Sequence, residues 1–167
     1  MTATVKTEVV GVKEAVKSLR KIDPELRKQF NRDVKTIAAP VVDAARGAYP
    51  DMPLSGMSRI WSAGSRQLLP WSASKARSGV QVKIDTSKRA VSVIRIQQKD
   101  AAASIFELAG KKGTNPKGRA FINNLEARFG RAQRVLWPTY ERNSAEVTSR
   151  MRETVLAASR EVQKELG

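Results

Sequence analysis

The chain contains no cysteine and no histidine among its 167 residues. The absence of cysteine excludes disulfides, thiolate nucleophiles and cysteine metal sites. The absence of histidine excludes the Ser-His-Asp triad, a histidine general base and the usual zinc sites. Carboxylates, lysines and tyrosines remain as reactive side chains, but no motif brings them together. We therefore expect no enzymatic activity, no cofactor and no bound metal.

Long hydrophobic runs are also missing. No apolar segment approaches the roughly 18 residues that a membrane-spanning helix needs, and the N-terminus lacks the apolar core of a signal peptide. Hydrophobic residues make up 41% of the chain and charged residues 28%, a composition typical of a globular domain that folds in water. The length predicts a single domain over residues 1–167. The absence of long apolar runs predicts no membrane contact.

Negative charge is scarce. The chain has 16 acidic and 31 basic residues, which gives a formal net charge of +15. Residues 49–99 carry nine basic and two acidic side chains, whereas residues 139–167 carry five of each, so the excess belongs to the middle of the chain. Such a field attracts polyanions, chiefly nucleic acid. An acidic neighbouring subunit and simple solubility are the alternatives that the charge leaves open.

Alternating β-branched residues dominate the stretch Gly79–Gln97. Val80, Val82 and Ile84 alternate with polar residues, and a second apolar run ends at Ile96 after a polar break. This pattern predicts a β-hairpin. Helical patterns lie on both sides of it. The sequence therefore predicts an α+β fold: a small antiparallel sheet with a central hairpin, packed by N-terminal helices and a long C-terminal helix.

Three amphipathic segments predict those helices. The first covers Gly11–Ile22, after a short strand over Lys6–Val10. The second runs from Pro24 to about Gly47, and Pro40 inside it is expected to kink or split it. The last covers Thr139–Leu166. Their apolar stripes predict packing in the core or against another subunit.

The connecting segments are less regular. Met57–Trp61 predicts a strand that joins the sheet, whereas Gly64–Gly79 shows no clear period. Asp100–Leu108 predicts a short helix or the entry to a strand. The glycines, proline and positive charges of Ala109–Arg119 predict an exposed, mobile basic loop.

The candidate functional residues form a basic group and an aromatic group. The last three basic members recur at a spacing of three and predict one helix face. We expect the basic group to face DNA or an acidic partner, with a merely solvated face as the alternative. Its members are Lys111, Lys112, Lys117, Arg119, Arg128, Arg131 and Arg134. The aromatic group is expected at subunit contacts, although packing inside the domain stays open for Trp71. It contains Trp61, Trp71, Phe106 and Trp137.

Several short patterns resemble the minor tail and neck proteins of long-tailed bacteriophages, the family that includes the lambda-type tail-completion protein Z. The opening GVKEAVKSLRKIDPELRKQF is similar to the family's first helix and its entry into a long second helix. Pro50–Gly56 is similar to the break that follows. Ile105–Glu107 with Gly113-Thr114, and then Leu136–Pro138, resemble two later family stretches. The chain departs from the family in the insertion Gly64–Gly79 and in Trp137, where phenylalanine is usual.

The resemblance implies a structural virion protein at the head–tail junction, without enzymatic activity. Such proteins act in tail completion, tail termination or head–tail joining. The implied partners are copies of the chain in a ring, expected to be a hexamer, together with other neck, head-closure and tail-tube proteins and the genomic double-stranded DNA. The implied location is the tail or neck of the virion, after assembly in the host cytoplasm.

The sequence also bears on two other function classes. A free-standing, sequence-independent nucleic-acid-binding protein is the main alternative, while no helix-turn-helix, zinc-finger or aromatic RNA-binding signature indicates a sequence-specific regulator. A magnesium-dependent enzyme is disfavoured because the middle of the chain offers no close pair of carboxylates.

Overall fold

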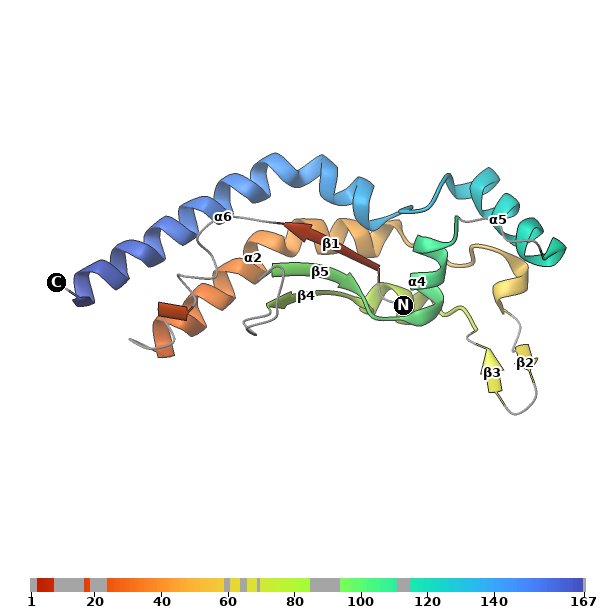
Figure 1. Cartoon of the computed structure of the whole chain (residues 1–167), viewed down its shortest axis with the longest axis horizontal. Helices are drawn as coiled ribbons and strands as arrows, with labels where there is room; N and C mark the ends of the chain where they lie inside the picture. Colours follow the sequence, from red (N-terminus) through yellow and green to blue (C-terminus); the bar gives the residue numbers. More distant parts are fainter. Residues whose placement is uncertain are drawn as a thin grey trace.

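Two long helices, α2 and α6, run side by side along the long axis of the molecule (Figure 1). The computed structural model describes residues 3–7, 17–18, 24–58, 61–63, 66–68, 70–84, 94–110 and 115–166. Within them α2 spans Pro24–Ala48 and α6 spans Leu136–Leu166. A three-stranded antiparallel sheet packs against this pair, which confirms the predicted α+β class. The helix predicted for Gly11–Ile22 lies outside the described residues, apart from Lys17 and Ser18, which are helical.

Helix α2 follows the predicted apolar stripe. Its buried side chains recur at helical spacing and face the sheet and α6, as a core-facing amphipathic helix requires. Pro40 is exposed and lies inside the helix, which is not split there. A proline removes one backbone hydrogen bond, but buried residues on both sides of Pro40 hold the two halves in place. The buried stripe consists of Phe30, Val34, Ile37, Ala38, Val41, Val42 and Ala45.

Helix α6 buries the stripe that the sequence predicts. Val147, Met151 and Val155 are buried, and the stripe continues as half-buried residues towards the C-terminus. The helix begins at Leu136 rather than at Thr139. Pro138 is tolerated because it lies in the first turn, where the backbone N–H groups have no partner within the helix.

The predicted hairpin forms the centre of the sheet. Strand β4 spans Val80–Ile84 and β5 spans Ile94–Gln98, paired antiparallel so that Val82 lies opposite Ile96. Strand β1, Ala3–Thr7, pairs with the other edge of β5, which gives the order β1-β5-β4. β1 therefore includes residues before the predicted Lys6–Val10. Val91 and Val93 of the predicted hairpin lie outside the described residues.

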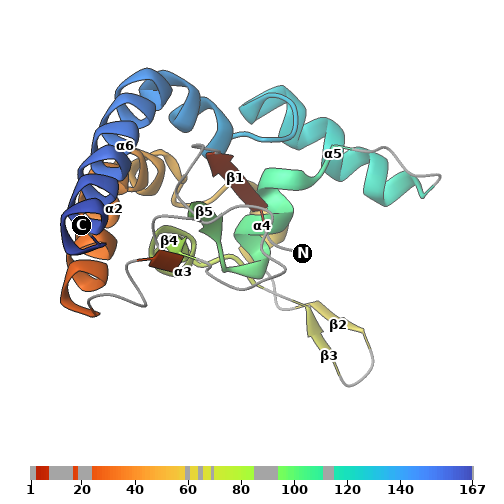
Figure 2. The ribbon, with the colours of Figure 1, turned by 60° about the vertical axis from the view of Figure 1, so that its left-hand side comes forward.

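A second, two-stranded sheet stands apart from the main body (Figures 1 and 2). Strand β2, Trp61–Ala63, pairs with β3, Arg66–Leu68. The prediction that Met57–Trp61 joins the main sheet is wrong for its described residues. A 3₁₀ turn, η1, occupies Ser55–Ser58, and within the described part of the chain β2 pairs with β3 alone. Short local pairing explains why the surrounding sequence shows no clear period.

Short helices join the sheet to the rest of the molecule. Helix α3 spans Ala73–Ser78. Helix α4 spans Ala101–Leu108, so the segment predicted as a short helix or a strand entry, Asp100–Leu108, forms a helix. Ser72 and Asp100 cap their first turns by accepting hydrogen bonds from backbone N–H groups, a usual role for these residue types. Helix α5 spans Pro116–Phe129 and lies at one end of the molecule (Figure 1).

Gly79 occupies a position where the chain passes close to the buried amide of Gln98. A Cβ atom at Gly79 would lie 1.9 Å from Gln98 Oε1 and 2.9 Å from the Lys75 carbonyl oxygen. Gln98 Nε2 donates to the Ala76 carbonyl at 2.7 Å, and its Oε1 accepts from the Asp100 N–H at 2.8 Å. An added methyl group therefore breaks a satisfied buried network.

We expect Gly79→Ala to lower the free energy of unfolding by about 1–3 kcal/mol, the usual effect of overpacking a rigid site. Urea unfolding followed by circular dichroism measures the change. Gly47→Ala is the matched control, because nothing lies within 4 Å of a Cβ there and alanine is favoured over glycine inside a helix. Equal effects of the two variants would contradict the expected steric conflict at Gly79.

Candidate functional site

Helix α5 carries a group of exposed cations. Asn115 caps the helix, with its Oδ1 accepting from the Lys117 N–H at 2.9 Å, and Pro116 lies in the first turn. Lys117 and Arg119 are therefore exposed residues of a helix and not of a mobile loop, which corrects the prediction for Ala109–Arg119. Lys111 and Lys112 lie outside the described residues.

The last turn of α5 fixes the position of Arg128. Its guanidinium donates to the Pro53 carbonyl at 3.1 Å and lies 5.9 Å from the centre of the Phe129 ring. Gly130 then ends the helix with a positive φ of 79°, which glycine adopts without steric cost. Arg131 follows this turn and is exposed. Arg128, Arg131 and Arg134 therefore do not form the single helix face that their spacing predicted.

Arg134 points inward. Its guanidinium donates to the carbonyl oxygens of Phe106 and Ala109, which lie at the C-terminal end of α4. It also lies 5.7 Å from the centre of the Phe106 ring. Burial lowers the pKa of the Arg134 side chain from its ordinary value, while the negative charge of Glu107 acts in the opposite direction. Because these contacts engage its guanidinium, Arg134 is a structural residue, and its assignment to the exposed basic group is corrected.

Four predicted cations thus remain exposed near one end of the molecule (Figure 1). We call them the α5 basic surface: Lys117, Arg119, Arg128 and Arg131. Exposed cations can bind phosphates or carboxylates with little desolvation cost, and these interactions weaken as salt rises.

Glu107 lies at the centre of the junction between α4 and α6. The residue is 1% exposed. Its carboxylate accepts from the Tyr49 hydroxyl at 2.8 Å, from the Val135 N–H at 3.2 Å and from the Leu136 N–H at 3.1 Å. The buried carboxylate therefore caps the N-terminus of α6, where the helix dipole favours a negative charge. Burial, and then the charge of Glu107, raise the pKa of Tyr49 above its ordinary value.

The aromatic group divides between the core and the surface. Trp71 and Phe106 are buried with their ring centres 5.5 Å apart, and Trp71 Nε1 donates to the Asp51 carbonyl at 2.9 Å. Because both rings are enclosed by this chain, their prediction as subunit contacts is corrected. Trp61 lies in the separate hairpin. Trp137 is 44% exposed and packs beside Tyr140, so its prediction as a subunit contact stands untested.

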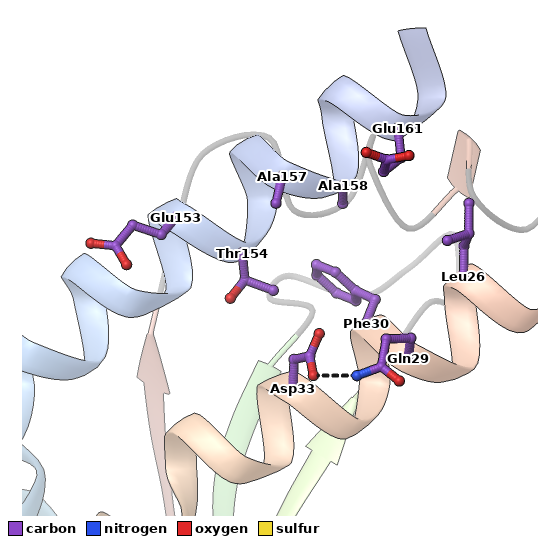
Figure 3. Close-up of a pocket in the computed structure, with 9 residues that line it drawn as sticks. All are labelled: Leu26, Gln29, Phe30, Asp33, Glu153, Thr154, Ala157, Ala158 and Glu161. Carbon is purple, nitrogen blue, oxygen red and sulfur yellow. Dashed lines mark hydrogen bonds between the residues drawn. The ribbon is translucent and has the colours of Figure 1, made fainter. Parts of the chain in front are cut away.

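A groove between the first half of α2 and the second half of α6 lies at the other end of the molecule (Figures 1 and 3). Its volume is about 400 Å³. Apolar side chains and the carboxylates of Asp33, Glu153 and Glu161 line it together. We call this feature the acidic groove. Its lining residues are Leu26, Gln29, Phe30, Asp33, Glu153, Thr154, Ala157, Ala158 and Glu161.

Sequence reasoning missed both the acidic groove and the role of Glu107. The carboxylates of the groove come from helices that are far apart in the sequence, so no local spacing links them. The one available signal was that these carboxylates border the apolar stripes of two helices. Both stripes were predicted to pack in the core or against another subunit.

Two general classes of site receive no support from the described residues. The described residues contain no group of three or more acidic side chains that could hold a metal ion. None of the helices in the described part of the chain is both long enough and apolar enough to cross a membrane. Comparisons of the chain with protein-family models, with curated proteins and with solved structures found no match.

Proposed function

We propose that this chain is a structural virion protein of a long-tailed phage. In this proposal it forms a ring around the DNA channel at the head–tail junction and joins head to tail, as a tail-completion, terminator or joining protein. The resemblance of its sequence patterns to the minor tail and neck proteins supports this function. The observation that carries it is the separate hairpin of β2 and β3.

The hairpin of β2 and β3 makes few contacts with the other described elements of the chain. Trp61 pairs with Leu68 and Ala63 with Arg66, and neither strand packs extensively on another described element. A lone two-stranded hairpin is marginally stable in water, and among the described residues each strand has one unpaired edge. Another protein surface that pairs with or covers these edges would stabilise it. A projecting arm of this kind suits a subunit of an assembly better than a protein that acts alone.

The α5 basic surface supports a second candidate function. Four exposed cations and a net charge of +15 favour weak, salt-sensitive and sequence-independent binding of nucleic acid. In a ring, such charge would suit either the genome or an acidic protein neighbour. In a free-standing protein, it would act on nucleic acid alone.

Solution mass and virion assembly together test the proposal. We expect the purified chain to form closed oligomers, measured by native mass spectrometry at low and high salt, with and without double-stranded DNA. In a phage that encodes the chain, its deletion should leave separate heads and tails, and the intact chain should restore joining. The proposal is refuted if the purified chain is strictly monomeric and its deletion leaves virions intact. If that monomer also binds DNA in a salt-dependent way, the nucleic-acid-binding alternative takes its place.

A further inference from the structure

We infer that the acidic groove of one copy receives helix α5 of the next copy, so that the chains join head to tail. This inference rests on the proposed function, because it assigns the contact that would build the ring. It combines the chemistry of the groove, the exposed face of α5 and the positions of both in the molecule.

The groove has an apolar floor and a rim of carboxylates, of which that of Glu153 is directed outward (Figure 3). Phe30 and Ala158 contribute to the floor, and the lining includes three carboxylates, of which that of Glu161 is paired with Lys164 at 2.8 Å. Asp33 accepts from the amide of Gln29 at 2.7 Å, and Glu153 accepts from the Ser149 hydroxyl. Neither carboxylate has a cationic partner among the described residues. In a chain of net charge +15, such a rim favours a cationic occupant and repels DNA phosphates.

The exposed face of α5 has the complementary pattern. At about 100° per residue, Ala120, Asn123 and Ala127 lie along the middle of one face, and all are exposed. On the same geometry Arg119 lies along one side of this strip, together with Glu126. Lys117 and Arg128 lie along the other side, where the Arg128 guanidinium also donates to the Pro53 carbonyl. Small residues in the middle allow a close approach between helices. The cations at both sides would then meet the acidic rim.

The two features lie at opposite ends of the molecule. The groove is near the N-terminus of α2 and the C-terminus of α6, whereas α5 lies at the far end of the long axis (Figure 1). A contact between two different surfaces is heterologous. It generates a ring when the rotation between neighbours closes, and an open filament when it does not. The same pair of surfaces can therefore link every neighbour in the proposed ring.

Disulfide trapping tests the contact directly, because the chain has no cysteine of its own. Ala120→Cys on α5 and Ala157→Cys in the groove are combined in one chain. Under mild oxidation we expect a ladder of covalent oligomers on a non-reducing gel, which disappears with reductant. The control combines Ala120→Cys with Ala145→Cys, an exposed position of α6 outside the groove lining. A ladder no stronger than that of the control overturns the inference.

Charge reversal provides a second test. One variant carries Asp33→Lys and Glu153→Lys, and the other carries Lys117→Glu and Arg119→Glu. Each variant alone should lose self-association at least about tenfold, since two favourable ion pairs become repulsive. An equimolar mixture should reassemble, because each groove then meets a helix of opposite charge. Association that is unchanged in the single variants, or not recovered in the mixture, contradicts the inference. Circular dichroism checks that both variants fold.

The outcomes separate this inference from the proposed function. Rings that form without cross-linking at these positions would overturn the groove contact and leave the neck function standing. A clear ladder from a chain whose deletion leaves virions joined would retain the contact and remove the neck function. A cross-link to another virion protein in place of a second copy would overturn the inference.

Discussion

Replacing Glu107 by alanine is expected to lower the free energy of unfolding by about 3–5 kcal/mol. The substitution removes the acceptor for the Tyr49 hydroxyl and for the N–H groups of Val135 and Leu136. All three donors lie in the interior around a residue that is 1% exposed, so water cannot readily replace the carboxylate. The first turn of α6 also loses its cap. Urea unfolding followed by circular dichroism measures the loss.

Two companion variants separate the parts of this effect. Tyr49→Phe removes one donor and leaves the two backbone hydrogen bonds of Glu107, so its cost should be about 1 kcal/mol. Glu107→Gln keeps the size of the side chain and one acceptor oxygen, and should fall between the other two variants. A loss of less than about 1 kcal/mol for Glu107→Ala would mean that the carboxylate does not hold α6 in place.

Phe106→Ala is expected to have an effect of similar size, about 3–5 kcal/mol, because it removes a fully buried aromatic ring and leaves a cavity. The Phe106 ring lies 5.5 Å from that of Trp71, 5.2 Å from that of Phe129 and 6.2 Å from that of Tyr49, measured between ring centres. These three partners come from three different parts of the chain. Truncating Phe106 therefore loosens the junction of α2, α4 and α5 at once.

Trp137→Ala is the matched aromatic control. Trp137 is 44% exposed, so its truncation should cost about 1 kcal/mol or less in the isolated chain. If Trp137 contacts a neighbouring subunit, this variant should instead weaken self-association, which analytical ultracentrifugation detects. Equal losses of unfolding free energy for Phe106→Ala and Trp137→Ala would contradict the division of the aromatic group into core and surface residues.

The main helices and strands of this fold follow from patterns in the sequence. The apolar stripes of α2 and α6 and the alternation around Val82 and Ile96 each repeat within one segment, so a local pattern reveals which face is buried. The α+β class followed from the order of these segments. The net charge, and the absence of cysteine and histidine, also follow from the sequence without any structure.

Local signals were less reliable where a residue that starts or ends a helix lies inside a different sequence pattern. The glycines and proline of Ala109–Arg119 predicted a loop, but Asn115 and Pro116 start a helix that includes Lys117 and Arg119. The spacing of Arg128, Arg131 and Arg134 predicted one face, but Gly130 ends the helix between them. In both cases a capping or terminating residue outweighed the pattern around it.

The contacts between distant side chains become visible in the tertiary structure alone. It turned Arg134 inward to the end of α4, placed Glu107 under the first turn of α6, and enclosed Trp71 and Phe106 in the core. It also joined carboxylates of α2 and α6 into the acidic groove, opposite the end that carries α5. Periodicity reports the faces of one element, whereas these contacts depend on how distant elements pack, and no spacing along the chain encodes that.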